Sequence, residues 1–238
     1  MPKTRLIAAL DTPDLKSAEA LLKKLKGLPV VYKVGSGLFT SAGPRAVDLV
    51  HKYGGKVFLD LKFHDIPNTV KNAVESAAGL GVYSVSLHLS GGAEMLKAAG
   101  SVKKRPLLWG ITVLTSFDER SFARTGSKNN IEKTIFSLAA MAAENGADGI
   151  VCSPREVSAV KKRFGGILKV VTPGIRLEAG GDPALFPNGP KRGADDQKRT
   201  MTPAGAASAG ADFIVVGRPI LKAADPASAV RDILEAIQ

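Results

Sequence analysis

The stretch Lys56-Val57-Phe58-Leu59-Asp60-Leu61-Lys62 has the pattern of a buried strand that ends in charge. Its apolar residues are of the β-forming type, and a helical pattern follows over Asn68–Leu80. A buried strand followed directly by a helix is the repeating unit of parallel α/β folds, because parallel strands need a crossover connection.

The same unit recurs along the whole chain. The expected strands are Arg5–Asp11, Val30–Gly35, Lys56–Lys62, Val82–His88, Leu107–Leu114, Asp148–Ser153, Leu168–Pro173 and Asp212–Gly217. The helices expected after them are Leu15–Leu25, Ala42–Tyr53, Asn68–Leu80, Ala93–Ala99, Ile131–Asn145, Pro154–Phe164, Thr202–Ala209 and Pro226–Ile237. Eight such units predict an α/β fold, a single-domain (β/α)8 TIM barrel over residues 1–238. A doubly wound sheet would need fewer units or a reversal of strand order.

Composition agrees with one barrel domain. The 238 residues are 45% hydrophobic but only 5% aromatic, which predicts a largely aliphatic core. One long irregular stretch, residues 177–199, is rich in Gly, Pro, Asp and Lys. A loop of that length in a compact domain predicts a mobile, functional segment, here on the phosphate side of the site.

The formal net charge of +11 favours anionic partners. The densest cationic groups lie near the ends of expected helices, so we interpret them as solvated surface and expect no nucleic-acid partner. We expect no membrane span and no secretory leader. The single cysteine, Cys152, lies in an apolar strand and is interpreted as a core residue, and its being alone favours a reduced, cytoplasmic location.

Polar residues fall repeatedly at the carboxyl ends of the expected strands. They are Asp11, Lys33, Asp60, Lys62, His88, Thr115, Ser153, Pro173-Gly174-Ile175-Arg176 and Gly217-Arg218-Pro219. Active sites of (β/α)8 barrels are built at this end. The set therefore predicts an active site, although His88 or Ser153 alone is as readily a structural residue.

The centre of the set is Asp60, Lys62 and Asp65. Side chains alternate along a strand, so Asp60 and Lys62 should project together into the barrel mouth, with Lys33 beside Asp60. An array Lys33–Asp60–Lys62–Asp65 would hold all four groups ionised. Such an array suits a reaction in which negative charge develops and is then protonated. A purely structural ion-pair network would be expected at the other end of the barrel.

The loops after the seventh and eighth strands contain Gly174, Arg176, Gly217 and Arg218. Glycine backbone N–H groups with arginine predict a phosphate site there. The sequence Gly35-Ser36-Gly37 lacks the third glycine of a dinucleotide fingerprint. The three histidines are widely spaced and Lys62 already supplies a cation, so no metal is expected.

The run Asp60-Leu61-Lys62-Phe63-His64-Asp65-Ile66-Pro67-Asn68-Thr69 resembles the signature of the orotidine 5′-phosphate decarboxylase family. The resemblance extends over nearly the whole chain, through the segments Ala9-Leu10-Asp11, Lys33-Val34-Gly35, Val113-Leu114-Thr115-Ser116, Thr172-Pro173-Gly174-Ile175-Arg176 and Val216-Gly217-Arg218-Pro219-Ile220. It implies decarboxylation of orotidine 5′-phosphate to uridine 5′-phosphate, the last step of de novo UMP synthesis. It also implies no cofactor and a homodimer with shared sites.

The resemblance further implies residue roles. Lys62 would protonate carbon six, and Asp60 would lie near the departing carboxylate. Lys33 and Asp11 would contact the ribose hydroxyls, and Thr115 the pyrimidine. Asp65 and Thr69 would reach in from the other subunit. The phosphate end would be held by Arg176, Gln197, Gly217 and Arg218.

Two other functions compete with this interpretation. A related enzyme that uses Mg²⁺ on a sugar phosphate, such as a hexulose-phosphate synthase or a keto-gulonate-phosphate decarboxylase, would keep Asp60, Lys62 and Asp65, but the stretch from His64 to Thr69 argues against it. A basic nucleic-acid-binding protein would leave the charges at the strand ends unexplained.

Overall fold

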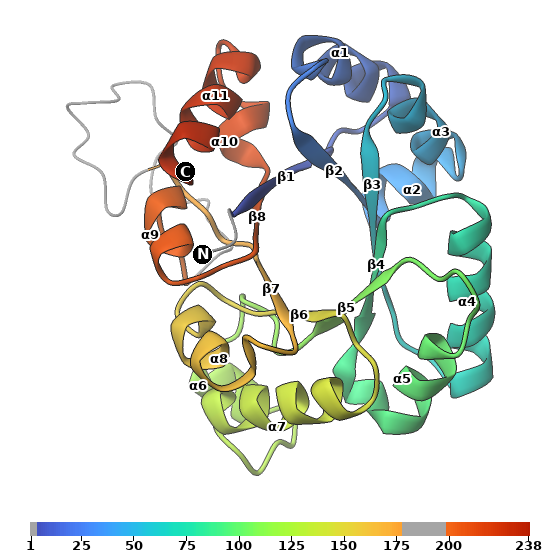
Figure 1. Ribbon diagram of the computed structural model, residues 1–238, viewed down its shortest axis with the longest axis vertical. Coiled ribbons are helices and arrows are strands. Elements are labelled where there is room, and N and C mark those ends of the chain that lie inside the picture. Colours follow the sequence, from blue (N-terminus) through green and yellow to red (C-terminus); the bar gives the residue numbers. More distant parts are fainter. Residues whose placement is uncertain (1–3, 178–198) are drawn as a thin grey trace.

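The computed structural model describes residues 4–177 and 199–238. Eight parallel strands form a closed barrel in sequence order, and β1 closes it by pairing with β8 (Figure 1). The strands are β1 (Arg5–Ala9), β2 (Val30–Gly35), β3 (Lys56–Phe63), β4 (Ser84–His88), β5 (Leu107–Ile111), β6 (Gly149–Val151), β7 (Lys169–Thr172) and β8 (Phe213–Val216). The predicted (β/α)8 barrel is thereby confirmed.

Helices surround the barrel on its outside (Figure 1). They are α1 (Leu15–Leu25), α2 (Ser36–Ala42), α3 (Arg45–Lys52), α4 (Pro67–Gly79), α5 (Gly92–Gly100), α6 (Glu119–Ala123), α7 (Ile131–Glu144), α8 (Val157–Phe164), α9 (Pro203–Ser208), α10 (Arg218–Leu221) and α11 (Pro226–Ala236), with a 3₁₀ turn, η1, at Leu89–Gly91. Side-chain caps set several of their starts. Asp14 accepts a 2.8 Å hydrogen bond from the Ser17 N–H at the start of α1, and Asn130 caps α7 in the same way.

The observed elements differ from the predicted ones at several strand ends and in the region of Ala42–Tyr53. β2 has the predicted bounds and β3 is one residue longer, but the other six strands are shorter than predicted, so Asp11 and Ser153 lie in the loops that follow β1 and β6. The helix predicted over Ala42–Tyr53 begins only at Arg45, as α3, and a further helix that was not predicted, α2, ends at Ala42. Gly43, with a φ of 59°, and Pro44 separate α2 from α3, because neither residue continues a helix at that point. The short helices α6 and α10 carry too few residues to show a periodic pattern.

The core has two parts. The larger part, between the sheet and the helices, is mainly aliphatic, as predicted. The smaller part fills the barrel interior below the mouth, and it is not aliphatic throughout. It includes Phe58, Trp109 and Phe213, with the Trp109 and Phe213 ring centroids 5.5 Å apart. The few aromatic residues are thus partly concentrated where wide side chains fill the barrel.

The basic clusters lie as expected at helix ends. Lys23 and Lys24 occupy the last turn of α1, and Lys161, Lys162 and Arg163 that of α8. Among the helices of the described ranges, none has the length and apolar character that a bilayer crossing requires.

Candidate active site

A chain of alternating charges occupies the barrel mouth. The Lys62 ammonium lies 2.9 Å from each carboxylate oxygen of Asp60. On the other side, Lys33 Nζ lies 3.7 Å from Asp60 Oδ2 and 2.9 Å from Asp11 Oδ1. The structure therefore brings Lys33, Asp60 and Lys62 together, as predicted. Within one chain the fourth member of the array is Asp11 rather than the predicted Asp65.

Asp60 is the buried centre of this array, with 8% of its surface exposed. Burial by itself would raise the pKa of its carboxyl group. The ammonium groups of Lys33 and Lys62, with hydrogen bonds from Lys62 and Ser86, outweigh burial and lower the pKa below its ordinary 3.8. Asp60 is accordingly a carboxylate at neutral pH, held between two cations.

Ser86, on the neighbouring strand β4, holds this centre together. Its hydroxyl donates a 2.7 Å hydrogen bond to Asp60 Oδ1 and accepts a 2.9 Å bond from the backbone N–H of Lys62. Ser86 is not among the site residues predicted from the sequence. The polar residues Ser84, Ser86 and His88 alternate along β4, and that period of two was the available signal that this strand turns a polar face inward.

The backbone at Lys62 departs from a regular strand. The pairing of β3 with β4 shifts register between Leu59 and Phe63, and Lys62 has a φ of 53°. A β-bulge re-aims the side chains around it, and a non-glycine residue at positive φ is held there at a cost. Simple alternation predicted the meeting of Lys62 with Asp60, but it did not predict the bulge through which the two groups meet.

A cavity of about 450 Å³ opens beside the array. It is lined by Asp11, Thr12, Pro13, Lys33, Gly35, Ser36, Gly37, Leu38, Asp60 and Lys62. Gly35 makes room for the array, since a Cβ atom there would lie 3.0 Å from Lys33 Nζ. The Gly35-Ser36-Gly37 stretch therefore borders the candidate site, although it lacks the dinucleotide fingerprint.

The residues expected to hold phosphate also lie at this end of the barrel. Arg176 follows β7, and its Nη1 donates a 2.8 Å hydrogen bond to the carbonyl of Ile175. Gly217 and Arg218 follow β8, at the start of α10. A Cβ atom at Gly217 would lie 3.4 Å from Asp11 Oδ2, so this loop adjoins the charged array. Gln197 lies outside the described residues.

Two of the predicted site residues lie away from the array of their own chain. Asp65 is exposed, and its carboxylate accepts a 2.7 Å hydrogen bond from the N–H of Ile66. Thr69, on α4, is exposed as well. Within residues 4–177 and 199–238, no ion pair joins Asp65 to Lys62. Thr115, in the loop after β5, is partly buried near the mouth.

His88 and Ser153, the two residues whose roles the sequence left open, differ in their surroundings. His88 is partly buried next to His64, with ring centroids 5.3 Å apart. Burial, reinforced by the nearby charges of His64 and Lys62, lowers the pKa of His88, so it stands as a neutral ring at the edge of the site. Ser153 is fully buried and accepts a 3.3 Å hydrogen bond from the Arg155 N–H, which is a local structural contact. Cys152 is a buried core residue, as predicted.

The site offers cations and carboxylates rather than a metal centre. Across the described part of the chain, His, Cys, Asp and Glu side chains do not gather in threes as a metal site would need. In this arrangement the buried Asp60 carboxylate can repel a substrate anion, and a neighbouring ammonium group can stabilise a newly formed anion and deliver a proton to it.

Comparisons with known proteins agree with this geometry. The family model "Orotidine 5′-phosphate decarboxylase / HUMPS family" matches residues 4–233. A protein of Trichlorobacter lovleyi named orotidine 5′-phosphate decarboxylase is 44% identical over 99% of this chain and 95% of its own length. One of the same name from Halorhodospira halophila is 45% identical over 96% of this chain and 94% of its own.

Solved structures show the same relationship. The crystal structure titled orotidine 5′-phosphate decarboxylase from Lactobacillus acidophilus superposes with a TM-score of 0.82, at 34% identity and 99% coverage of both chains. A family model that spans nearly the whole chain, full-length relatives above 40% identity and a shared barrel lead to one conclusion. The chain belongs to the orotidine 5′-phosphate decarboxylase / HUMPS family.

Proposed function

We propose that this protein is a carboxy-lyase that converts orotidine 5′-phosphate to uridine 5′-phosphate, the last step of UMP biosynthesis, without a cofactor and with Lys62 as the proton donor. The observation that carries the proposal is the fixed contact of the Lys62 ammonium with the buried carboxylate of Asp60. The names of the full-length relatives support the substrate and the reaction.

The chemistry follows from that contact. The bond between carbon six and the carboxylate breaks, carbon dioxide leaves, and the electron pair remains on carbon six. The Lys62 ammonium, already ordered by Asp60, stabilises this negative charge without reorganising solvent. It then gives carbon six a proton and regains one from water. Asp60, near the departing carboxylate, contributes repulsion that is relieved as carbon dioxide forms.

The remaining residues bind and orient the substrate. Asp11 and Lys33, joined by a 2.9 Å ion pair, contact the ribose hydroxyls, and Thr115 contacts the pyrimidine. Gly217, Arg176 and Arg218, with Gln197, hold the phosphate. Phosphate lies far from the reacting carbon, so its binding energy can be used to assemble the site rather than only to retain substrate.

The functional unit we propose is a homodimer. The strip from His64 to Thr69 is exposed in the single chain, and Ile66 at its centre has 67% of its surface exposed. A large apolar side chain that is exposed in this way suits a contact between identical subunits. Asp65 and Thr69 would then complete the partner's site. A cytoplasmic location suits a chain whose single cysteine, Cys152, is buried.

The test is to follow the ultraviolet absorbance of orotidine 5′-phosphate with the purified protein, before and after treatment with EDTA. We expect turnover that EDTA leaves unchanged. Activity lost with EDTA and restored by Mg²⁺ would favour the metal-dependent sugar-phosphate chemistry of related enzymes instead. Absence of turnover by the folded protein would contradict the proposal.

A further inference from the structure

We infer that Arg199 and Glu156 are positioning residues that fix the loop carrying Thr115 relative to the loop carrying Arg176. This inference rests on the proposed function of the site. Neither residue lines the cavity beside Lys62, so their effect on catalysis would pass through these two loops.

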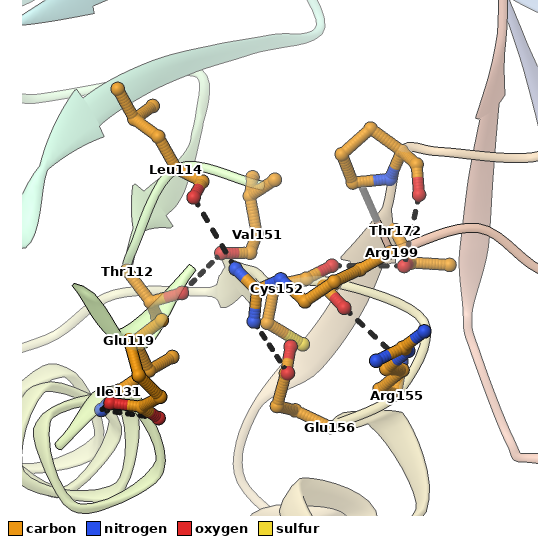
Figure 2. A network of polar contacts seen from close by, with 12 residues as sticks. Thr112, Leu114, Glu119, Ile131, Val151, Cys152, Arg155, Glu156, Thr172 and Arg199 are labelled. Carbon is orange, nitrogen blue, oxygen red and sulfur yellow. Dashed lines mark hydrogen bonds and ion pairs between the residues drawn. The ribbon is translucent and has the colours of Figure 1, made fainter. Parts of the chain in front are cut away.

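The contact itself is a buried ion pair. Arg199 Nη1 lies 2.7 Å from Glu156 Oε1, and the two side chains are 9% and 14% exposed. The second terminal nitrogen, Nη2, donates a 3.3 Å hydrogen bond to the carbonyl of Leu114 (Figure 2). One guanidinium thus joins the segment before α8 to the loop after β5.

The pyrimidine side is tied through Leu114. Its carbonyl also accepts a 3.1 Å hydrogen bond from the N–H of Phe117, so the turn around Thr115 is held at one oxygen from two directions. Thr115 is the next residue in the chain. A change in the Arg199 guanidinium would therefore be transmitted directly to the backbone beside Thr115.

The phosphate side is tied through Met201, two residues after Arg199. The Met201 N–H donates a 3.2 Å hydrogen bond to the carbonyl of Gly174, and the Arg176 N–H donates a 3.0 Å bond to the carbonyl of Met201. These bonds form a short parallel bridge. The backbone of Arg176 is thus fixed to the same strand-like segment whose first described residue is Arg199.

The pair is poorly explained by stability alone. Burying two charges removes their hydration, and that cost is offset only when their remaining hydrogen bonds are made. Here Glu156 Oε2 and Arg199 Nε are buried without a hydrogen-bond partner in the described part of the chain. The adjacent Cys152 adds no charge, because burial and the Glu156 carboxylate raise the pKa of its thiol. A costly pair that links the segment before α8 to the loops carrying Thr115 and Arg176 is suited to fixing the geometry of those loops.

The test compares Arg199→Lys, Arg199→Ala and Glu156→Gln with the double variant Arg199→Ala/Glu156→Ala, using orotidine 5′-phosphate turnover. We expect KM to rise roughly tenfold in each variant, because substrate must then order both loops, while kcat changes by less than about threefold. The double variant should lose no more than Arg199→Ala alone, since both changes remove the same link.

A matched control exists at the opposite end of the barrel, where Arg105 forms an ion pair with Asp148 ahead of β5 and β6. Arg105→Lys and Asp148→Asn should lower the midpoint of thermal unfolding without changing KM. The inference is overturned if the folded Arg199→Lys and Glu156→Gln proteins keep the wild-type KM, or if the Arg105 variants raise it equally. Absence of wild-type turnover would instead contradict the proposed function.

Discussion

The Lys62 ammonium lies 2.9 Å from both carboxylate oxygens of Asp60, although Lys62 itself is held at a φ of 53° in a bulged strand. The residue proposed to protonate carbon six therefore combines a strained backbone with a side chain that is held by the Asp60 carboxylate. Strain that persists in this way must be supported by the surrounding structure, here by the bond from the Lys62 N–H to Ser86.

The strain predicts a difference between two inactive variants. Lys62→Gly and Lys62→Ala both remove the ammonium, but only glycine adopts positive φ without a steric penalty. We expect the glycine variant to be more stable by about 1 kcal/mol in free energy of unfolding, measured with urea. Lys104, with the same φ of 53° on the surface, provides a comparison pair. Equal stability of the two Lys62 variants would show that its backbone is not strained.

Ser86 should matter for catalysis. Ser86→Ala removes the hydroxyl that donates to Asp60 and accepts from the Lys62 N–H, and hydrogen bonds to charged groups contribute about 1.5–3 kcal/mol. We therefore expect kcat/KM to fall at least about tenfold.

The control for Ser86 lies on the same strand. Ser84 is fully buried, and its hydroxyl has no hydrogen-bond partner in the described part of the chain. Ser84→Ala should leave kcat/KM unchanged. A similar loss in both serine variants would mean that β4 packing, rather than the bond to Asp60, is responsible.

His88 should make stability depend on pH. Burial lowers its pKa below the ordinary 6.5, so just below pH 6.5 the unfolded chain binds more protons than the folded protein. This contribution to stability is complete above pH 6.5 and is lost as the pH falls toward the folded-state pKa. Unfolding with urea from about pH 5 to about pH 7.5 should show a smaller rise in stability for His88→Gln than for the wild type. An equal rise in the two proteins would show that His88 is not the group responsible.

The homodimer with shared active sites that we propose predicts complementation between two inactive proteins. Lys62→Ala and Asp65→Ala should each be inactive as homodimers. In a mixed dimer, one site would combine the intact Lys62 of one chain with the intact Asp65 of the other. Mixing equal amounts and allowing subunits to exchange should restore about a quarter of the wild-type activity. If each site takes Asp65 from its own chain, mixing would restore nothing.

Most of the fold could be predicted from sequence patterns, because strand-like and helix-like runs alternate along the chain. They also placed Asp60, Lys62 and Lys33 together, since parallel strands bring their carboxyl ends to one mouth. The residues that these patterns do not identify make their contacts between segments that are distant in sequence. Ser86 bonds to Asp60 across 26 positions of sequence, and Arg199 meets Glu156 across 43. No periodicity reports such pairs.

The most direct test of the account is turnover of orotidine 5′-phosphate by Lys62→Ala beside the wild type, with circular dichroism to confirm that both are folded. The variant is expected to fold and bind uridine 5′-phosphate but to lose nearly all decarboxylation, because it lacks the ammonium group proposed to give carbon six its proton. A folded Lys62→Ala protein with kcat near that of the wild type would contradict it.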